Sequence, residues 1–282
     1  MANEVPGTVA GGPVVVATGV GKVFGTGEGK VTALDGIDLS ISQGEFVSLI
    51  GPSGCGKSTL LRLIGDLTSP TSGNLTVNGK TPSRARLDRD YGMVFQAPVL
   101  MDWRTIAKNI ELPLEIMGYA ADERRRRSAD LLRLVELDAF AERHPWELSG
   151  GMQQRVAIAR ALAYEPEVLL MDEPFAAVDA QTRADLEDLV RALWQRLGMT
   201  ILFVTHDIDE AVYLGQRVLT LSASPTVVQD ELTVDLPAER DQLHTRADPR
   251  FVTLRTRVYS QIQAAKTGTA SGAAGELSNA DR

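Results

Sequence analysis

The chain has 282 residues, a length that suits one large domain or two small ones. Its composition, 44% hydrophobic and 23% charged, is that of an ordinary globular protein that can bury a sizeable core. The net charge of −8 disfavours general nucleic-acid binding, and we expect no nucleic-acid partner. No apolar run reaches the roughly 18 residues that span a bilayer, and the start lacks the pattern of a secretory signal. The single cysteine, Cys55, excludes an intrachain disulfide framework and suits a reducing cytosol.

Two segments at the ends of the chain differ from the rest. Residues 1–12 and 266–282 are rich in Gly, Ala, Ser and Thr and offer little apolar surface to bury. We expect both segments to be disordered and the ordered domain to span residues 13–265.

Three short apolar runs alternate with helical patterns: FVSLI at 46–50, VLLM at 168–171 and ILFVT at 201–205. This alternation predicts an α/β fold with a mostly parallel sheet, and nearly continuous apolar runs are typical of strands covered on both faces. The runs end in Gly51, in Asp172-Glu173 and in His206, respectively. In such sheets ligands bind beyond the carboxyl ends of the strands, and if the three strands are parallel neighbours, these groups converge on one edge.

The segment GPSGCGKST, residues 51–59, follows the first of these runs. It fits the phosphate-binding loop pattern, in which two glycines separated by four residues precede Lys-Ser. Glycines let backbone N–H groups approach phosphate oxygens, and the helix that follows adds the positive end of its dipole. Lys57 supplies a cation for the phosphates and Ser58 a hydroxyl for Mg²⁺. The alternative is a glycine-rich turn that caps a helix, and we interpret Cys55 as a small residue that fills the loop rather than a redox group. The predicted phosphate-binding residues are Gly51, Ser53, Gly54, Cys55, Gly56, Lys57, Ser58 and Thr59.

Two carboxylates, Asp172 and Glu173, end the second apolar run in EVLLMDEP. Taken alone, such a pair is no more than a solvated strand exit. Beside a phosphate loop it suits a magnesium nucleotide, because Asp172 can hold the ion through water and Glu173 can polarise the attacking water. We therefore predict a magnesium site that includes Ser58 and Asp172, with Glu173 as the catalytic base.

Further motifs follow in an order that is similar to one known family. The segment LSGGMQQR, residues 148–155, resembles the signature of the ATP-binding cassette (ABC) ATPases. The segments MVFQ ending at Gln96, AAVDA around Asp179 and VTHD around His206 resemble other motifs of that family. The resemblance covers roughly residues 14–235. The flanks APVLMDWRTIAKNIELPLEIMG and DPRFVTLRTRVYSQI resemble importers for nitrate, sulfonates, taurine and related solutes.

The resemblance implies roles for several residues. Phe24 occupies the position of an aromatic that stacks on adenine, Gln96 would contact Mg²⁺ and the attacking water, and His206 would hydrogen-bond the γ-phosphate. Asp179 lies in a loop that contributes to the nucleotide site. Without the family, Phe24 would be an ordinary strand aromatic and His206 a capping or surface residue. The chain departs from the family pattern at Met152, at Phe24 and just before Asp179, but these changes preserve size.

A second anion site is predicted at Ser149, Gly150 and Gly151, because they precede the helical run MQQRVAIARALAY and so lie at a helix N-terminus. A helix cap alone would explain the serine but not the two glycines. In the family, two chains pack head to tail, and each ATP lies between the phosphate loop of one chain and the signature of the other. The resemblance thus implies a second ATPase subunit, expected to be an identical chain, with ATP and Mg²⁺ as cofactors.

The expected fold is an α/β P-loop core with a small antiparallel β subdomain that holds Phe24 and a helical subdomain inserted at about 97–165. The resemblance implies the ATPase subunit of an importer for a small anionic solute, peripheral to the cytoplasmic face of the membrane. Its permease would dock near Met101–Thr105, and an external solute-binding protein would join through the complex. The alternatives are a soluble ABC ATPase without a transport role, another kind of P-loop enzyme and, for Trp103, simple burial. Arg124–Arg127 are expected to be a solvated face paired with acids rather than a contact with lipid headgroups or a partner.

Overall fold

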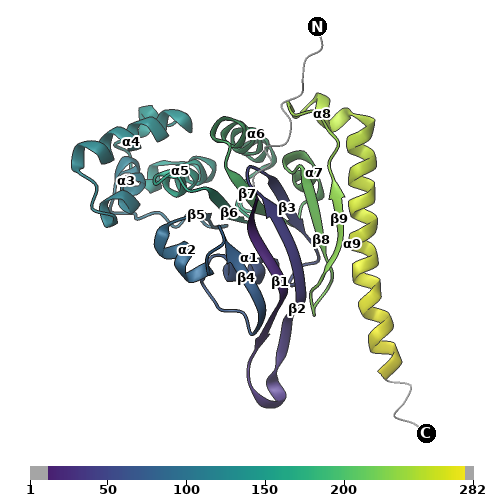
Figure 1. Cartoon of the computed structure of the whole chain (residues 1–282). Helices are drawn as coiled ribbons and strands as arrows, with labels where there is room; N and C mark the ends of the chain where they lie inside the picture. The colour runs from purple at the N-terminus through teal and green to yellow at the C-terminus, as the bar shows by residue number, and fades with distance from the viewer. Residues whose placement is uncertain (1–11, 277–282) are drawn as a thin grey trace.

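The computed structural model of the chain describes residues 12–276, and a six-stranded sheet forms its centre (Figure 1). The strand order is β5-β6-β7-β3-β8-β9, and all neighbours are parallel except β8 and β9. The strands are β3 (Phe46–Ile50), β5 (Tyr91–Val94), β6 (Val168–Asp172), β7 (Thr200–Val204), β8 (Arg217–Leu221) and β9 (Val228–Thr233). The three apolar runs are therefore β3, β6 and β7, and they are direct parallel neighbours, which is the condition for their ends to share one edge.

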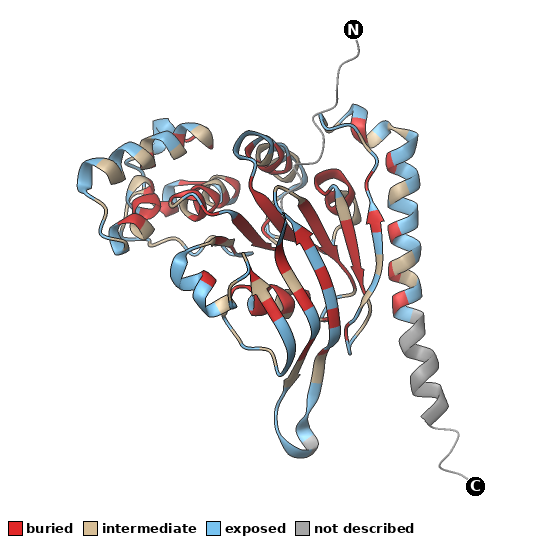
Figure 2. Ribbon diagram, viewed as in Figure 1, coloured by how far each residue is buried: buried red, intermediate tan, exposed pale blue. Residues whose placement is uncertain are grey.

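Strands β3, β6 and β7 are buried along their whole length (Figure 2). Their alternate side chains enter two different apolar clusters, because successive residues of a strand point to opposite faces. Leu49, Leu170 and Leu202 join the cluster that includes helix α1 (Lys57–Ile64). Phe46, Leu169 and Phe203 join the cluster that includes helices α6 (Ala180–Leu197) and α7 (Ile208–Leu214). Cover on both faces explains why these runs are apolar at every position except Ser48, Asp172 and Thr200.

A second sheet of three antiparallel strands lies over the first cluster. Its order is β2-β1-β4, made of β1 (Pro13–Phe24), β2 (Val31–Ser42) and β4 (Ser72–Val77). Buried and exposed residues alternate along the second half of β2, which is typical of a strand with one solvated face. Phe24 is the last residue of β1 and pairs with Val31, so the predicted antiparallel subdomain does hold Phe24.

Three helices between β5 and β6 form an insertion with a core of its own. They are α3 (Ile106–Ile116), α4 (Ala121–Leu134) and α5 (Gly150–Leu162), with the short turns η2 (Asp138–Phe140) and η3 (Pro145–Glu147) between the last two. Ile110, Leu132 and Val156 are buried against one another in this insertion. In Figure 1 the three helices extend to one side of the central sheet. The α/β class with an antiparallel sheet and inserted helices is therefore confirmed.

The remaining elements are short connections and a C-terminal pair of helices. They are η1 (Gly27–Gly29), α2 (Pro82–Asp88), α8 (His244–Ala247) and α9 (Pro249–Glu276). Phe251, Val258 and Ile262 of α9 are buried in the same cluster as α6 and α7. Within residues 12–276 no helix is both long and apolar enough to cross a bilayer.

The backbone of α9 continues as helix to Glu276. The expected disorder of residues 266–282 stays a prediction. The predictions for residues 1–11 and 277–282 lie outside the described residues.

Candidate functional site

The loop between β3 and α1 is seated tightly against the core. Gly54 and Gly56 have φ angles of +75° and +111°, in the left-handed region that favours glycine. A Cβ added to Gly51 would lie 2.9 Å from the carbonyl oxygen of Leu221, and one added to Gly56 would lie 2.9 Å from Cδ2 of Leu34. Ser53 and Gly54, at the outer turn of the loop, stay exposed to solvent. The glycines are therefore required both by backbone conformation and by close packing.

Lys57 is the first residue of α1, and its ammonium group binds back to the start of the phosphate loop. Its Nζ donates to the carbonyl oxygens of Gly51 at 2.9 Å and Pro52 at 3.0 Å, and the side chain is almost fully buried. A buried ammonium group needs such acceptors, because removing a charge from water is costly. Cys55 is also buried, and burial raises the pKa of its thiol, which fits a space-filling residue rather than a reactive one.

Ser58 and Asp172 meet across the gap between α1 and the end of β6. The Ser58 hydroxyl donates to Oδ1 of Asp172 at 2.7 Å, and Thr59 follows on the same helical turn. Within the described residues no group of three or more His, Cys, Asp or Glu side chains could hold a metal. A hydroxyl and a single carboxylate nevertheless fit Mg²⁺, because this ion takes one or two protein carboxylates and completes its shell with phosphates and water. The pair therefore suits a magnesium ion that arrives with a nucleotide.

Glu173 and His206 form a second polar pair at the same edge. Nδ1 of His206 lies 3.0 Å from Oε2 of Glu173, although the two residues are 33 positions apart in the sequence. Glu173 has a φ of +47°, unusual for a residue other than glycine, and its backbone N–H donates to the Val204 carbonyl at 2.9 Å. Non-glycine residues in this region cluster at functional sites, where the surrounding structure holds them in place. The geometry thus presents a carboxylate and an imidazole side by side just beyond β6 and β7.

Gln96 lies two residues after β5, and its side chain is exposed. Among the described residues it makes no hydrogen bond to Ser58 or Asp172. The neighbouring backbone is tied to the helical insertion, because buried Gln154 of α5 donates Nε2 to the Phe95 carbonyl at 3.2 Å. The structure thus links the segment before Gln96 to the signature helix, a contact that the sequence did not indicate.

Asp179 and Ser149 are both helix N-caps. Asp179 accepts from the N–H of Thr182 at 3.0 Å and from its hydroxyl at 2.6 Å, and the Thr182 hydroxyl bond is the largest cause of the lowered pKa of this carboxyl. Ser149 accepts from the N–H of Met152 at 3.3 Å at the start of α5. The two helix starts touch, because a Cβ on Gly151 would lie 2.1 Å from Cγ2 of Thr182. Packing therefore explains Gly151, whereas a Cβ on Gly150 would meet nothing within 4 Å.

The predicted site residues fall into four sets: the phosphate loop with Ser58 and Asp172, the Glu173–His206 pair, the signature and Phe24. The phosphate loop, Ser58 and Asp172 are joined by hydrogen bonds, and Glu173 and His206 lie at the same sheet edge. Within residues 12–276 no hydrogen bond or ion pair joins Ser149 to either of these groups. Phe24 is 45% exposed at the end of β1, with Nζ of Lys22 5.0 Å from its ring centre. Within the described part of the chain, the phosphate loop and the signature are therefore not joined by a direct bond.

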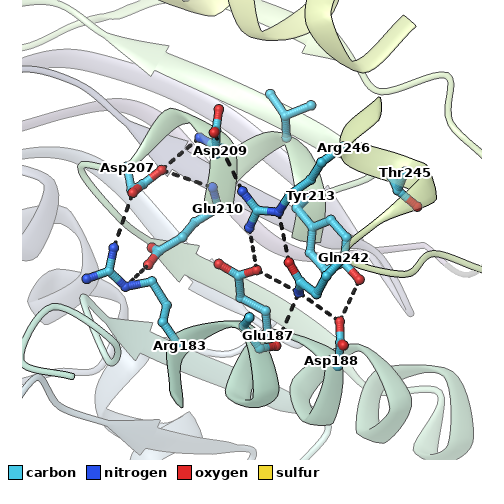
Figure 3. A network of polar contacts seen from close by, with 12 residues as sticks. Arg183, Glu187, Asp188, Asp207, Asp209, Glu210, Tyr213, Gln242, Thr245 and Arg246 are labelled. Atoms are coloured by element: carbon cyan, nitrogen blue, oxygen red, sulfur yellow. Dashed lines mark hydrogen bonds and ion pairs between the residues drawn. The ribbon is translucent and has the colours of Figure 1, made fainter. Parts of the chain in front are cut away.

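A polar network that links α6, α7 and α8 was not predicted from the sequence (Figure 3). Arg183 of α6 pairs with Asp207 at 3.4 Å and with Glu210 at 3.5 Å, and Glu210 accepts from the Thr205 hydroxyl. Arg246 of α8 pairs with buried Glu187 at 2.7 Å, and Gln242 donates to the same carboxylate at 3.0 Å. The network joins α6, whose N-cap is Asp179, to α7, whose N-cap Asp207 directly follows His206. The only sequence signal was the presence of charged residues on otherwise apolar helix faces.

The loop, its lysine and the serine–aspartate pair at the edge of a parallel sheet define a P-loop nucleoside triphosphatase. A family model described as "ABC transporter" matches residues 34–176. With relatives more than 40% identical over most of its length, the chain belongs to the ABC transporter family.

Two relatives and one solved structure illustrate the similarity. The chain is 44% identical to the nitrate import ATP-binding protein NrtD of Synechocystis sp., over 89% of this chain and 95% of that protein. It is 46% identical to the aliphatic sulfonates import ATP-binding protein SsuB 1 of Pseudomonas syringae, over 83% and 91% of the two chains. The solved structure is a dimeric, post-hydrolysis state of the ATP-binding cassette MJ0796 bound to ADP and Pi. It matches with a TM-score of 0.70 and 40% identity, over 79% of this chain and 100% of that one.

We expect the stability of the chain to depend on pH through Glu210. Burial is the largest cause that raises the pKa of this carboxyl to about 7, above the ordinary 4.5 that applies after unfolding. Between these values the folded state binds more protons than the unfolded state, so the free energy of unfolding falls as pH rises. The Glu210→Gln variant keeps an acceptor for the Thr205 hydroxyl and removes this ionisation. Urea unfolding measures this free energy at each pH. Between about pH 5 and pH 7.5, the free energy of unfolding of the wild type should fall by on the order of 1–3 kcal/mol more than that of the variant.

The matched control for this comparison is Glu231→Gln, which neutralises an exposed carboxylate on β9. It should retain the wild-type pH profile. Equal pH profiles for wild type and Glu210→Gln would contradict the assignment to Glu210.

Proposed function

We propose that the chain is the ATP-hydrolysing subunit of an importer that takes up a small anionic solute of the nitrate or sulfonate kind through a separate permease. The observation that carries this proposal is the convergence of the phosphate loop, the Ser58–Asp172 pair and the Glu173–His206 pair at one sheet edge. The two relatives cited above are import proteins, which favours this role over a soluble ABC ATPase without a transport role.

Binding of the nucleotide follows from the loop. The N–H groups of residues 53–59 and the start of α1 would hold the β- and γ-phosphates, with Lys57 as the nearby cation. Ser58 and Asp172, joined by Gln96, would hold Mg²⁺, which offsets the negative charge that the phosphates carry and develop during transfer. Phe24, exposed at the end of the antiparallel sheet, would offer its ring to the adenine.

Hydrolysis would use the carboxylate and imidazole beyond β6 and β7. Glu173 accepts a proton from a water molecule whose oxygen attacks the γ-phosphorus, the bond to the bridging oxygen breaks, and ADP and phosphate result. Nδ1 of His206 lies 3.0 Å from that carboxylate, so the imidazole orients it and leaves Nε2 free to face the γ-phosphate. The left-handed backbone at Glu173 holds the carboxylate in this position.

Replacing the proposed base should separate binding from turnover. The Glu173→Gln variant keeps the shape and a hydrogen-bonding group beside His206, so its ATP affinity should stay within a few-fold of wild type. Its hydrolysis rate should fall by about 10²-fold or more, because glutamine accepts no proton from water. Fluorescence titration with nucleotide measures the affinity, and phosphate release measures the rate of hydrolysis.

The control is Glu167→Gln, just before the start of β6, where within the described residues the carboxylate accepts a hydrogen bond from Asn78 alone. This variant should hydrolyse ATP at close to the wild-type rate. A near-native rate for Glu173→Gln would remove the assignment of the base.

The active unit would be a head-to-tail pair of identical chains. Ser149 caps α5, and the first N–H groups of this helix, including those of Gly150 and Gly151, have no partner within the helix. Among the described residues these three make no bond to the phosphate loop. An ATP held between the loop of one chain and the signature of a second would accept hydrogen bonds from the N–H groups of both elements. ATP then favours closure through contacts that exist only in the closed pair, and loss of the γ-phosphate removes them. The dimeric state of the solved ABC cassette supports this arrangement.

ATP-dependent pairing provides a second test. In the slow Glu173→Gln background, saturating ATP should convert monomers to dimers in light scattering. Adding Ser149→Arg should block this conversion but leave ATP binding to the monomer intact, because the bulky side chain fills the proposed second half-site. Adding Arg125→Gln, an exposed change on α4, should have no effect. A Glu173→Gln chain that stays monomeric with bound ATP would contradict the shared site.

The permease would dock on the segment Met101–Thr105. Trp103 in this segment is 76% exposed, so simple burial does not account for it. An exposed tryptophan is typical of protein interfaces, and the segment follows the Gln96 loop. An external solute-binding protein would join through the permease. The ATPase would then lie at the cytoplasmic face of the membrane.

Truncation of Trp103 should weaken assembly and spare the isolated ATPase. Trp103→Ala should reduce the amount of permease that co-purifies with the chain by about tenfold, the loss expected for an aromatic residue at the centre of an interface. ATP hydrolysis by the isolated chain should stay near the wild-type rate. The control Leu243→Ala removes a side chain that is equally exposed but lies next to α8. If Trp103→Ala co-purified with as much permease as wild type, the permease would bind at another surface of the chain.

A further inference from the structure

A groove of about 640 Å³ includes none of the residues assigned to the nucleotide site. Three segments line it: α4 of the helical insertion, the connection from α5 to β6, and the last turn of α6 with Met199 before β7. Its volume is within the range of small-molecule sites. It joins the helical insertion to the central domain at the start of β6 and β7, whereas the nucleotide residues lie at the ends of these strands.

The rim of the groove carries a surplus of positive charge. Four arginines line it, Arg126, Arg127, Arg133 and Arg196, against two carboxylates, Asp130 and Glu165. Arg126 and Arg127 also pair with Glu123 beside the groove, and Arg127 pairs with Glu165. Asp130 is shared by Arg126 and Arg133. The side chain of Arg196 makes no ion pair or hydrogen bond with any other described residue and is exposed, so its charge is the one on the rim that no carboxylate of the described residues offsets.

The floor of the groove is apolar. Leu131, Leu134, Leu162 and Met199 line it, and they pack against the core cluster on the α6 side of the sheet. No aromatic side chain lines the groove, so it offers no ring on which a nucleotide base could stack. An aliphatic chain would gain from contact with this floor, because burial of each CH₂ group contributes favourably to binding.

We propose that this groove binds a small organic anion with an aliphatic body, of the alkyl sulfonate or carboxylate class. The anionic group lies between Arg133 and Arg196, and the alkyl chain lies along the leucine floor. Guanidinium groups suit this headgroup, because their forked N–H donors match the geometry of such oxygens. This site goes beyond the proposed function, since it includes no residue of the nucleotide site and its occupancy requires no ATP turnover.

The test uses hexanesulfonate as the probe, on the full chain without nucleotide. Calorimetry should detect saturable binding to wild type, with methanesulfonate and inorganic sulfate about tenfold weaker or more because they lack the chain. Hexanol, which lacks the charge, should also bind more weakly. In a protein labelled at the methionine methyl groups, hexanesulfonate should shift the Met199 signal, which the Met199→Leu variant assigns.

Paired charge removals distinguish the groove from general attraction of anions. The Arg133→Gln/Arg196→Gln variant should lose about tenfold or more in affinity for hexanesulfonate. The Arg84→Gln/Arg125→Gln variant removes two exposed arginines outside the groove and should bind like wild type. Equal losses in the two variants, equal binding of sulfate, or no saturable binding to wild type would each overturn the proposal. So would arginine-dependent sedimentation with phosphatidylglycerol vesicles in a chain that does not bind hexanesulfonate.

Discussion

The parallel pairing of β6, β7 and β3 is the constraint on which the candidate site depends. All three strands are buried on both faces, so their backbone can leave the core only at the strand ends. Pairing in one direction brings Asp172, His206 and the phosphate loop to the same edge, although more than 150 positions separate Gly51 from His206. The Ser58–Asp172 hydrogen bond then ties α1 to the end of β6.

The loops at this edge are supported by buried charge behind them. Glu187 and Glu210 lie within the protein, where an unpaired carboxylate would be strongly destabilising. Arg183 and Arg246 supply the compensating charge, and through them α6, α7 and α8 form one unit. Because α6 begins at the Asp179 cap and α7 begins just after His206, a shift in one loop is opposed by the whole network. The C-terminal helices thus contribute to the geometry of the site without touching a nucleotide.

The helical insertion is tied to the site at its near end and carries the arginine-rimmed groove at its far end. At the near end, Gln154 bonds to the Phe95 carbonyl and Gly151 packs on Thr182. The groove lies between α4 of the insertion and α6 of the central domain. A ligand there would contact both parts of the chain at once. The expected pairing of Arg124–Arg127 with acids is observed for all four. Arg126 and Arg127 also line the groove.

The sequence by itself determined the chemistry that is local along the chain. Glycines and a lysine between an apolar strand and a helix specify a phosphate loop, since only glycine adopts φ of +75° and +111° there without strain. Buried strands can also be predicted from the sequence, because cover on both faces favours apolar residues at nearly every position. The tertiary structure alone decided which distant groups meet. The Glu173–His206 pair spans 33 positions, and Arg246 reaches Glu187 across 59. Such contacts depend on strand order and helix packing, and no local pattern of residues encodes which charged side chain will face which.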